Sequence, residues 1–439
     1  MGPAVASTTD PAQGAERLTA ADASNLHLDA PDQVNAFLLA GLLAPGGFVA
    51  PGGTADLSQL RRAIDACLRA PGRSVGLGRF MQRVRGRGGD LYWEDSPPDL
   101  TWHIRSVDPV PGVQGLADLA AQLMTRPLPA DRPLWELLVV PGATPTAPGI
   151  ILRVHHCVAD GVAGVRLVRE LFGGDADETR AAPTIAAPRR PTSLRRRIRR
   201  VAAGLVRVAA VIRPTVARTV LLGPIGPRRG VAFVDDDLGA VSAGAKRVGA
   251  TVNDALLAAV AGGAETALRE AGQPVPPVLP ASVPVALPGG HGRSGNAVGV
   301  MLARLPTGVA DAADRMVRIA AVTREAKEAA RDQGSFELTR SRWGSRIFAC
   351  LARRQRFIAL FVTNVRGPER PLAVAGAPLL RAWPVAPIQG NVRLGVAAMS
   401  YAGRLGVAVH ADADALNAAV LGRALAAELR RGSAPAPQG

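Results

Sequence analysis

Cysteine and aromatic residues are scarce in this chain of 439 residues. Its three cysteines, Cys67, Cys157 and Cys350, lie far apart and form no C-x-x-C pair, which argues against a disulfide scaffold, a zinc site and a dithiol redox motif. The N-terminus also lacks the basic start and apolar core of a signal peptide. The sequence therefore predicts a cytoplasmic protein.

Long apolar runs are missing as well. No stretch of about 18 residues is uncharged and apolar enough to span a bilayer, so any membrane contact is expected to be peripheral, at the inner membrane face or at lipid droplets. Hydrophobic residues make up 48% of the chain and charged residues 20%, which are the proportions of a globular protein. A chain of this length usually divides, so we expect two domains.

Acidic residues are outnumbered, since 36 Asp and Glu against 52 Lys and Arg give a formal net charge of +16. Such an excess favours polyanions, among them nucleic acid, acidic membranes and phosphorylated cofactors. The chain has no zinc-finger spacing and no basic stripe interleaved with aromatic residues. We therefore expect no nucleic-acid partner.

Much of the basic excess lies between Glu178 and Asp235, where no acidic residue occurs. When residues 194–222 are projected as a helix, most of their arginines fall on one side, and apolar residues form the opposite face. Two interpretations stay open: a connecting helix packed on the domains, which Pro214 would break, and a surface that binds anionic lipid. The arginines that accumulate in this stretch include Arg189, Arg190, Arg195, Arg196, Arg197, Arg199, Arg200, Arg207, Arg213 and Arg218.

Helical and strand patterns alternate on both sides of this stretch, which indicates an α/β or α+β fold. In the first part, a helix is expected at Leu57–Leu68 and strands at Leu134–Val140 and Ile150–Val154. The expected organisation is a disordered N-terminus (1–17), a first domain (18–173), a basic crossover linker (174–229), a second domain (230–430) and a disordered tail (431–439).

The second domain begins with two predicted helices, Asp235–Val248 and Thr251–Ala271. The latter is expected to be capped by Thr251 or Asn253 and closed by Gly272. Strands are then expected at 278–287, 297–305, 357–364, 393–400 and 404–411, and helices at 310–327 and 415–430.

The strand pattern ending at Val154 runs directly into His155-His156-Cys157-Val158-Ala159-Asp160-Gly161, and a helical pattern follows. A neutral imidazole takes a proton from an alcohol near pH 7, and the N-terminus of a helix disfavours the protonated ring. This setting suits His156 as a general base beside His155. We expect Asp160 to hold the loop by a salt bridge, and Gly161 to leave room or allow an unusual backbone angle.

Spacing alone leaves a second interpretation open, in which the two histidines are merely packed or bind zinc. The chain has six histidines and no H-x-H or H-E-x-x-H partner near this loop, so we expect no metal. Catalysis and a packing role are about equally compatible with the residues by themselves.

His155-His156-x-x-x-Asp160-Gly161 resembles the HHxxxDG signature of the CoA-dependent acyltransferase superfamily. Four further segments resemble the wax ester synthase/diacylglycerol acyltransferase family and follow its order along the chain. They are Arg132-Pro133-Leu134-Trp135-Glu136, Gly223-Pro224-Ile225-Gly226-Pro227-Arg228-Arg229, Thr251-Val252-Asn253-Asp254-Ala255 and Thr363-Asn364-Val365-Arg366-Gly367-Pro368. With similar edges at Leu18–Asp22 and at Ser400, Tyr401 and Asp412, the resemblance covers nearly the full length.

This resemblance implies two chloramphenicol-acetyltransferase-like domains with His156 in a tunnel between them. It implies acyl-CoA as co-substrate with no bound cofactor, and a fatty alcohol or diacylglycerol as acceptor. Asn253, Asp254, Asn364 and Gly367 are expected along the tunnel, with Asn364 or a backbone N–H near Gly367 as oxyanion donor. Arginines near the entrance are expected to bind the CoA phosphates.

Each of these residues also has a simpler explanation, because Asn253 and Asp254 can cap a helix and residues 363–368 can be an ordinary turn. The chain departs from the family at Ala255 and Arg366, where Val and Pro are usual, and these departures bear on acceptor choice and rate. Two alternatives stay open: a peptide-synthetase condensation domain that takes carrier-bound substrates, and a non-catalytic lipid-binding protein.

Overall fold

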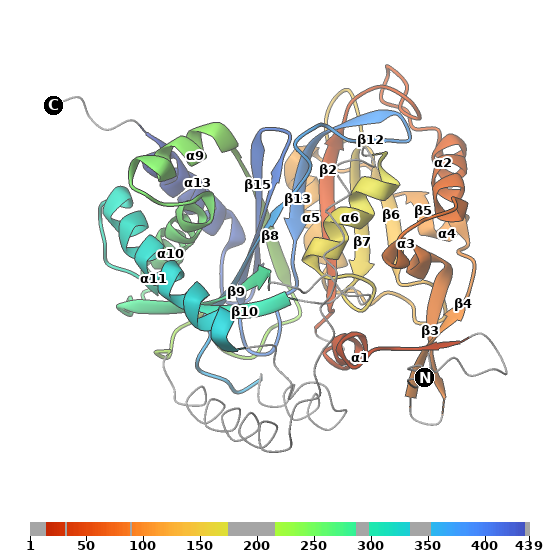
Figure 1. Cartoon of the computed structure of the whole chain (residues 1–439). Coiled ribbons are helices and arrows are strands. Elements are labelled where there is room, and N and C mark those ends of the chain that lie inside the picture. Colours follow the sequence, from red (N-terminus) through yellow and green to blue (C-terminus); the bar gives the residue numbers. More distant parts are fainter. Residues whose placement is uncertain are drawn as a thin grey trace, which may run out of the picture.

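The structure, a computed structural model, describes residues 15–30, 33–87, 90–173, 216–286, 298–333 and 353–434. Two six-stranded sheets stand side by side, and helices cover the outer side of each (Figure 1). This is the two-part α/β architecture that the sequence predicts.

The first sheet is built mainly from the N-terminal part of the chain. In spatial order its strands are β12 (Ala373–Val374), β13 (Ala377–Val385), β2 (Ala36–Leu43), β7 (Gly149–His155), β6 (Trp135–Val140) and β5 (Ile104–Ser106). Its helices are α1 (Ala20–His27), α2 (Leu57–Arg69), α3 (Val75–Gly78), α4 (Leu100–His103), α5 (Gly112–Leu123) and α6 (Gly161–Leu171). Strands β6 and β7 are buried along their whole length, as expected for apolar strands covered on both faces.

A small third sheet lies beside this one, made of β1 (Glu16–Arg17), β4 (Asp90–Asp95) and β3 (Gln82–Arg87). The sequence predicts disorder up to residue 17, and this prediction is wrong for β1. Glu16 pairs with Trp93 of β4, and its carboxylate lies 2.8 Å from Arg79, so the end of this segment is held by the sheet.

The second sheet comes from the C-terminal part, in the order β10 (Val298–Pro306), β9 (Val278–Ala286), β11 (Leu360–Arg366), β14 (Leu394–Tyr401), β15 (Arg404–Asp412) and β8 (Arg229–Asp237). Its helices are α9 (Leu238–Arg247), α10 (Val252–Glu270), α11 (Ala312–Gln333) and α13 (Ala418–Ser433). Most strands and helices predicted here lie within a few residues of the observed elements.

Two boundaries differ from the prediction. Residues 235–237 end strand β8, which pairs with β15, and Asp237 caps α9 by accepting from the N–H of Ala240, so this helix begins at Leu238. Helix α13 continues to Ser433, so the first residues of the predicted tail are helical. Of the predicted crossover linker, residues 174–215 lie outside the described residues.

Strand β13 links the two parts. Although it lies late in the sequence, it pairs antiparallel with β2 of the first sheet, with Trp383 opposite Ala40. The ring of Trp383 stacks on Phe233 of β8 at 4.7 Å, and its Nε1 donates to Asp235 at 3.0 Å. An apolar cluster that includes α5, β7 and residues of β8 and β13 fills the space between the sheets. The two parts therefore share a core.

Candidate active site

The loop from His155 to Gly161 joins β7 to α6. Asp160 ends it as the N-cap of α6, since its Oδ1 accepts from the N–H of Ala163 at 2.8 Å. This helix cap holds the loop through the backbone, and the salt bridge that the sequence predicts for Asp160 stays a prediction. The histidines therefore sit directly before the positive end of a helix.

His155 is buried, and both of its ring nitrogens have partners. Nδ1 lies 3.1 Å from the backbone nitrogen of Cys157, and Nε2 lies 2.9 Å from Oδ2 of Asp29. Because a backbone N–H can only donate, Nδ1 must be the unprotonated nitrogen and Nε2 must carry the hydrogen. His155 is thus a fixed ring whose N–H faces a carboxylate.

His156 is only partly buried. Its backbone N–H donates to the carbonyl of Asn35 at 2.9 Å, and its carbonyl accepts from Nδ2 of Asn25 at 3.4 Å. The ring of Phe37 meets the imidazole edge-on, with 5.2 Å between centroids. Helix α1 and strand β2 therefore hold this histidine from the N-terminal side.

The surroundings of His156 favour the neutral ring. Burial lowers its pKa to about 4, and the neighbouring His155 acts in the same direction. A hydrogen bond with the backbone of Ala159 and the charge of Asp29 oppose this shift. At neutral pH the imidazole is therefore unprotonated, the form that a general base needs.

Cys157 lies between these groups but is not a candidate nucleophile. Burial raises the pKa of its thiol well above the usual range, and the charges of Asp22 and Asp29 add to this effect. The thiolate is the reactive form of cysteine, so this side chain is inert near neutral pH. The histidines remain as the reactive groups of the loop.

The second part of the chain reaches the loop through β11. A Cβ atom placed on Gly161 would lie 3.4 Å from Cγ1 of Val365, so β11 approaches the start of α6 closely. Asn364 precedes Val365 on this strand and is half-buried. Within the described ranges, no residue forms a hydrogen bond with the Asn364 side chain.

Gly367 does not offer its amide to a ligand. Its N–H donates to the carbonyl of Ser400 at 2.9 Å, and a Cβ atom would lie 2.4 Å from the same oxygen. The Gly367 amide itself is therefore engaged, and an oxyanion donor among the backbone N–H groups near Gly367 stays a prediction. Glycine is needed here because β11 ends against the neighbouring strand.

Asp254 has a structural role, and its expected place along the tunnel stays a prediction. Its Oδ2 accepts from the backbone N–H and the hydroxyl of Thr251, at 2.9 and 2.7 Å, which completes a capping box on α10. Its Oδ1 accepts from the hydroxyl of Thr323 at 2.6 Å, which joins α10 to α11. Asn253 is half-buried beside this cap, and its place along a tunnel stays a prediction.

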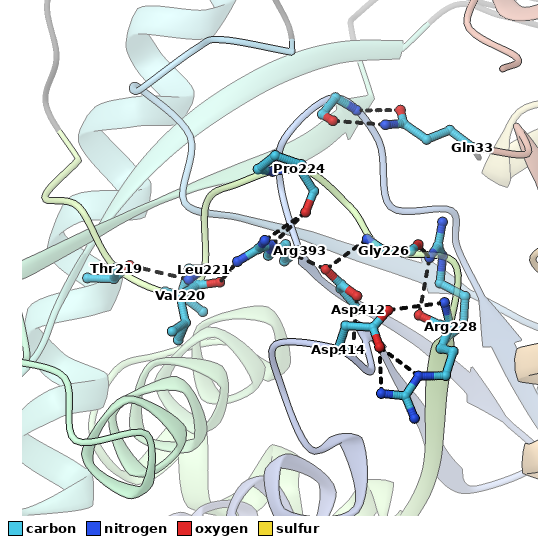
Figure 2. Close-up of polar contacts among 12 residues, drawn as sticks. Gln33, Thr219, Val220, Leu221, Pro224, Gly226, Arg228, Arg393, Asp412 and Asp414 are labelled. Atoms are coloured by element: carbon cyan, nitrogen blue, oxygen red, sulfur yellow. Dashed lines mark hydrogen bonds and ion pairs between the residues drawn. The ribbon is translucent and has the colours of Figure 1, made fainter. Parts of the chain in front are cut away.

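The connection from β13 to β14 contributes contacts that sequence reasoning missed. Gln389 donates from Nε2 to Oδ1 of Asn35 at 2.5 Å, and Gly390 exchanges two hydrogen bonds with the side chain of Gln33, at 2.8 and 2.9 Å (Figure 2). These partners lie 354 and 357 residues apart, so no local pattern could reveal them.

The family-like segment from Gly223 to Arg229 forms a frame around the same connection. Gly226 donates its N–H to Oδ2 of Asp412 at 3.1 Å, and Arg393 lies 3.2 Å from the same oxygen (Figure 2). Arg393 also donates to the carbonyl of Pro224 at 2.7 Å. Because Asp412 is fully buried, these contacts fix the backbone of the second part.

Two negative findings apply to the described part of the chain alone. It holds no group of three or more His, Cys, Asp or Glu side chains placed to bind a metal ion. It also holds no helix with the length and apolar character needed to cross a bilayer. Apart from Arg218, the basic residues singled out in the predicted linker lie outside it.

Sequence comparison finds the same family over both parts. Residues 18–220 match the wax ester synthase/diacylglycerol acyltransferase catalytic domain, and residues 294–431 match the WS/DGAT C-terminal domain. The probable diacylglycerol O-acyltransferase tgs1 of Mycobacterium tuberculosis is 30% identical over 90% of this chain and 91% of its own. A putative diacylglycerol O-acyltransferase of the same species is 31% identical over 74% of this chain and 72% of its own.

Solved structures share the fold. The wax ester synthase/diacylglycerol acyltransferase of Marinobacter aquaeolei VT8 matches with a TM-score of 0.68 at 23% identity, over 95% of this chain and 99% of that one. A trichothecene 15-O-acetyltransferase of Fusarium sporotrichioides matches with a TM-score of 0.64 at 11% identity, over 98% and 96%. The fold and the family resemblance predicted from sequence are thus confirmed, and the chain belongs to the wax ester synthase/diacylglycerol acyltransferase family of acyltransferases.

Proposed function

We propose that this chain transfers a fatty acyl group from acyl-CoA to the hydroxyl group of a lipid alcohol, with His156 as the general base. The observation that carries the proposal is the position of His156, whose partly accessible imidazole lies in the loop between the buried strand β7 and the N-terminus of α6. A starter condensation domain that shares the fold, with a TM-score of 0.56 at 14% identity, was solved with C8-CoA. This is consistent with an acyl-CoA donor.

The proposed reaction needs no covalent acyl-enzyme. His156 removes the hydroxyl proton as the acceptor oxygen attacks the thioester carbonyl, and the carbonyl electrons move onto oxygen. When the tetrahedral intermediate collapses, the carbon–sulfur bond breaks and the sulfur takes the proton back from the imidazolium. The products are an ester and the free thiol of CoA, and the ring of His156 returns to its neutral form.

Asn364 is the proposed donor to the oxyanion. Its carboxamide can donate two hydrogen bonds, and no described residue uses them. Its neighbour Val365 lies against Gly161 at the start of α6, which brings the backbone of β11 near the histidine loop, while the two side chains point to opposite faces of the strand. A prepositioned donor of this kind stabilises charge that develops only in the transition state.

The proposed acceptor is diacylglycerol, with a fatty alcohol as the second option. The names of the relatives at about 30% identity support diacylglycerol, since both are called diacylglycerol O-acyltransferases. We further propose a cytoplasmic enzyme in peripheral contact with anionic membrane or lipid droplets. The support for this contact is the acid-free, arginine-rich stretch between Glu178 and Asp235.

The test is a panel of acyl-CoA chain lengths crossed with diacylglycerol, fatty alcohols and water, read by release of CoA thiol and by ester formation. The proposal expects thiol release that depends on a lipid alcohol and equals the ester formed. Turnover with carrier-bound thioesters alone would indicate a condensation-type reaction. Lipid binding with no thiol release from any pair would indicate a non-catalytic protein.

A further inference from the structure

We infer that Asp29 is the positioning residue that fixes both histidines of the loop, and this inference rests on the proposed function of His156. Asp29 follows helix α1 and lies 126 residues before His155. Each of its two carboxylate oxygens accepts one hydrogen bond, and these two bonds lead to the two histidines by separate routes.

The first route runs through the ring of His155. The N–H of Cys157 donates to Nδ1, so the ring hydrogen must lie on Nε2, where Oδ2 of Asp29 accepts it at 2.9 Å. The ring is buried, so this hydrogen has no access to bulk water. Asp29 therefore holds, together with the N–H of Cys157, the tautomer and the orientation of His155.

The second route runs through the backbone of Asn35. Oδ1 of Asp29 accepts from the N–H of Asn35 at 2.6 Å, and the carbonyl of Asn35 accepts from the N–H of His156 at 2.9 Å. The side chain of Asn35 is held in turn by Gln389 from the second part of the chain. Displacing Asp29 would therefore move the backbone that carries His156.

Only a carboxylate accepts hydrogen bonds from both of the donors that face Asp29. Two donors, the ring N–H of His155 and the backbone N–H of Asn35, face Asp29, and an ionised carboxylate accepts on both oxygens. An Asn side chain has nearly the same shape, but it must turn its NH2 group toward one of these donors. The substitution Asp29→Asn thus changes the hydrogen bonding and leaves the volume unchanged.

The kinetic experiment compares wild type with Asp29→Asn and Asp29→Ala, and uses Asp65→Asn as the matched control. The Asp65 side chain is 36% exposed against 32% for Asp29, and it pairs with Arg69 on the outer helix α2. A displacement of about 1 Å at a reacting group can cost about 100-fold in rate. We expect kcat to fall by about this factor in both Asp29 variants with little change in KM, and both constants to be unchanged in Asp65→Asn.

The second readout is the long-range nitrogen–proton NMR spectrum of the imidazoles, with the His155 signals identified by their absence in His155→Ala. Wild type should show the tautomer with hydrogen on Nε2, and Asp29→Asn should shift or broaden that pattern while Asp65→Asn leaves it unchanged. Asp29→Asn with wild-type kcat, or with lost activity but an unchanged His155 pattern, would overturn the inference. If wild type transfers no acyl group, the proposed function fails, and the spectra still test Asp29.

Discussion

Asp29 and Asp412 are two carboxylates that use both oxygens as acceptors, yet their partners differ. Asp412 is fully buried and binds the backbone N–H groups of Gly226 and Asp414 and the guanidinium of Arg393 (Figure 2). Asp29 is about one-third exposed and faces the imidazole of His155 and the backbone N–H of Asn35, next to the candidate base.

The comparison shows that belonging to a family-like motif does not decide whether a residue lies at the candidate active site. The groups that its side chain contacts decide this. Asp412 and the Gly223–Arg229 segment resemble the family as clearly as the histidine loop does, and they hold the frame of the second part. Asp29 carries no motif of its own and lies against the histidines.

The largest expected effect is on the frame. Asp412→Ala leaves the guanidinium of Arg393 without its buried partner, and breaking such a pair costs about 3–5 kcal/mol of unfolding free energy. Urea unfolding of wild type and variant measures this loss. Asp414→Ala, which removes the exposed partner of Arg228, is the control and should cost much less. Equal losses in the two variants would contradict the assignment of Asp412 to the frame.

Acid should also weaken the fold through His103 and His410, in addition to His156, whose pKa burial lowers in the same way. Burial lowers the pKa of His103 and of His410 to about 4, below the value of about 6.5 for an unfolded histidine. As the pH falls from about 6.5 toward 4, the unfolded chain therefore binds protons that the folded chain excludes. The unfolding free energy should then fall by at most about 1.4 kcal/mol per pH unit for each histidine. Equal stability in urea at about pH 7 and about pH 5 would contradict this account.

A smaller effect is expected at the helix cap of the loop. Asp160→Ala removes the acceptor for the N–H of Ala163 and should cost about 1 kcal/mol in stability. It should also lower kcat, because the cap fixes the end of the histidine loop. Asp56→Ala removes a comparable cap from α2 and should cost similar stability with no loss of kcat. Loss of kcat in both variants would show that the effect is general destabilisation.

The smallest effect on the chemistry is expected from the basic stretch. Changing Arg195, Arg196, Arg197, Arg199 and Arg200 to Gln should abolish salt-sensitive co-sedimentation with anionic vesicles, since each arginine near such a surface contributes roughly 1 kcal/mol. Turnover of a water-soluble acceptor should be unchanged. If both proteins sediment equally, the stretch does not tether the enzyme.

The local elements could be predicted from sequence because their signals are local. The apolar run of β7, the loop that follows and the Thr251 cap of α10 each depend on residues within a few positions of one another. Strand β13 could not be placed, since its pairing with β2 joins segments more than 300 residues apart. Asp29 was missed for the same reason.

The candidate site was predicted in part. The spacing of the two histidines, Asp160 and Gly161 predicted that they share one loop. The structure adds the hydrogen-bond partners of His155 and Asp160. The structure adds hydrogen bonds inside the fold for Asp254 and for the Gly367 amide, and the predicted place of these two residues along the tunnel stays a prediction. A residue type that suits a ligand also suits a helix cap or a strand end, and sequence alone does not separate the two.

The most direct test of the central claim is the rate of acyl transfer by His156→Gln. Both proteins should be compared at saturating acyl-CoA and acceptor, with circular dichroism and melting temperature to confirm an intact fold. General-base catalysis contributes roughly 10²–10⁴-fold, so the account predicts a loss of kcat within this range and no acyl-enzyme in either protein. A folded His156→Gln variant that keeps turnover within a few-fold of wild type would show that His156 is not the base.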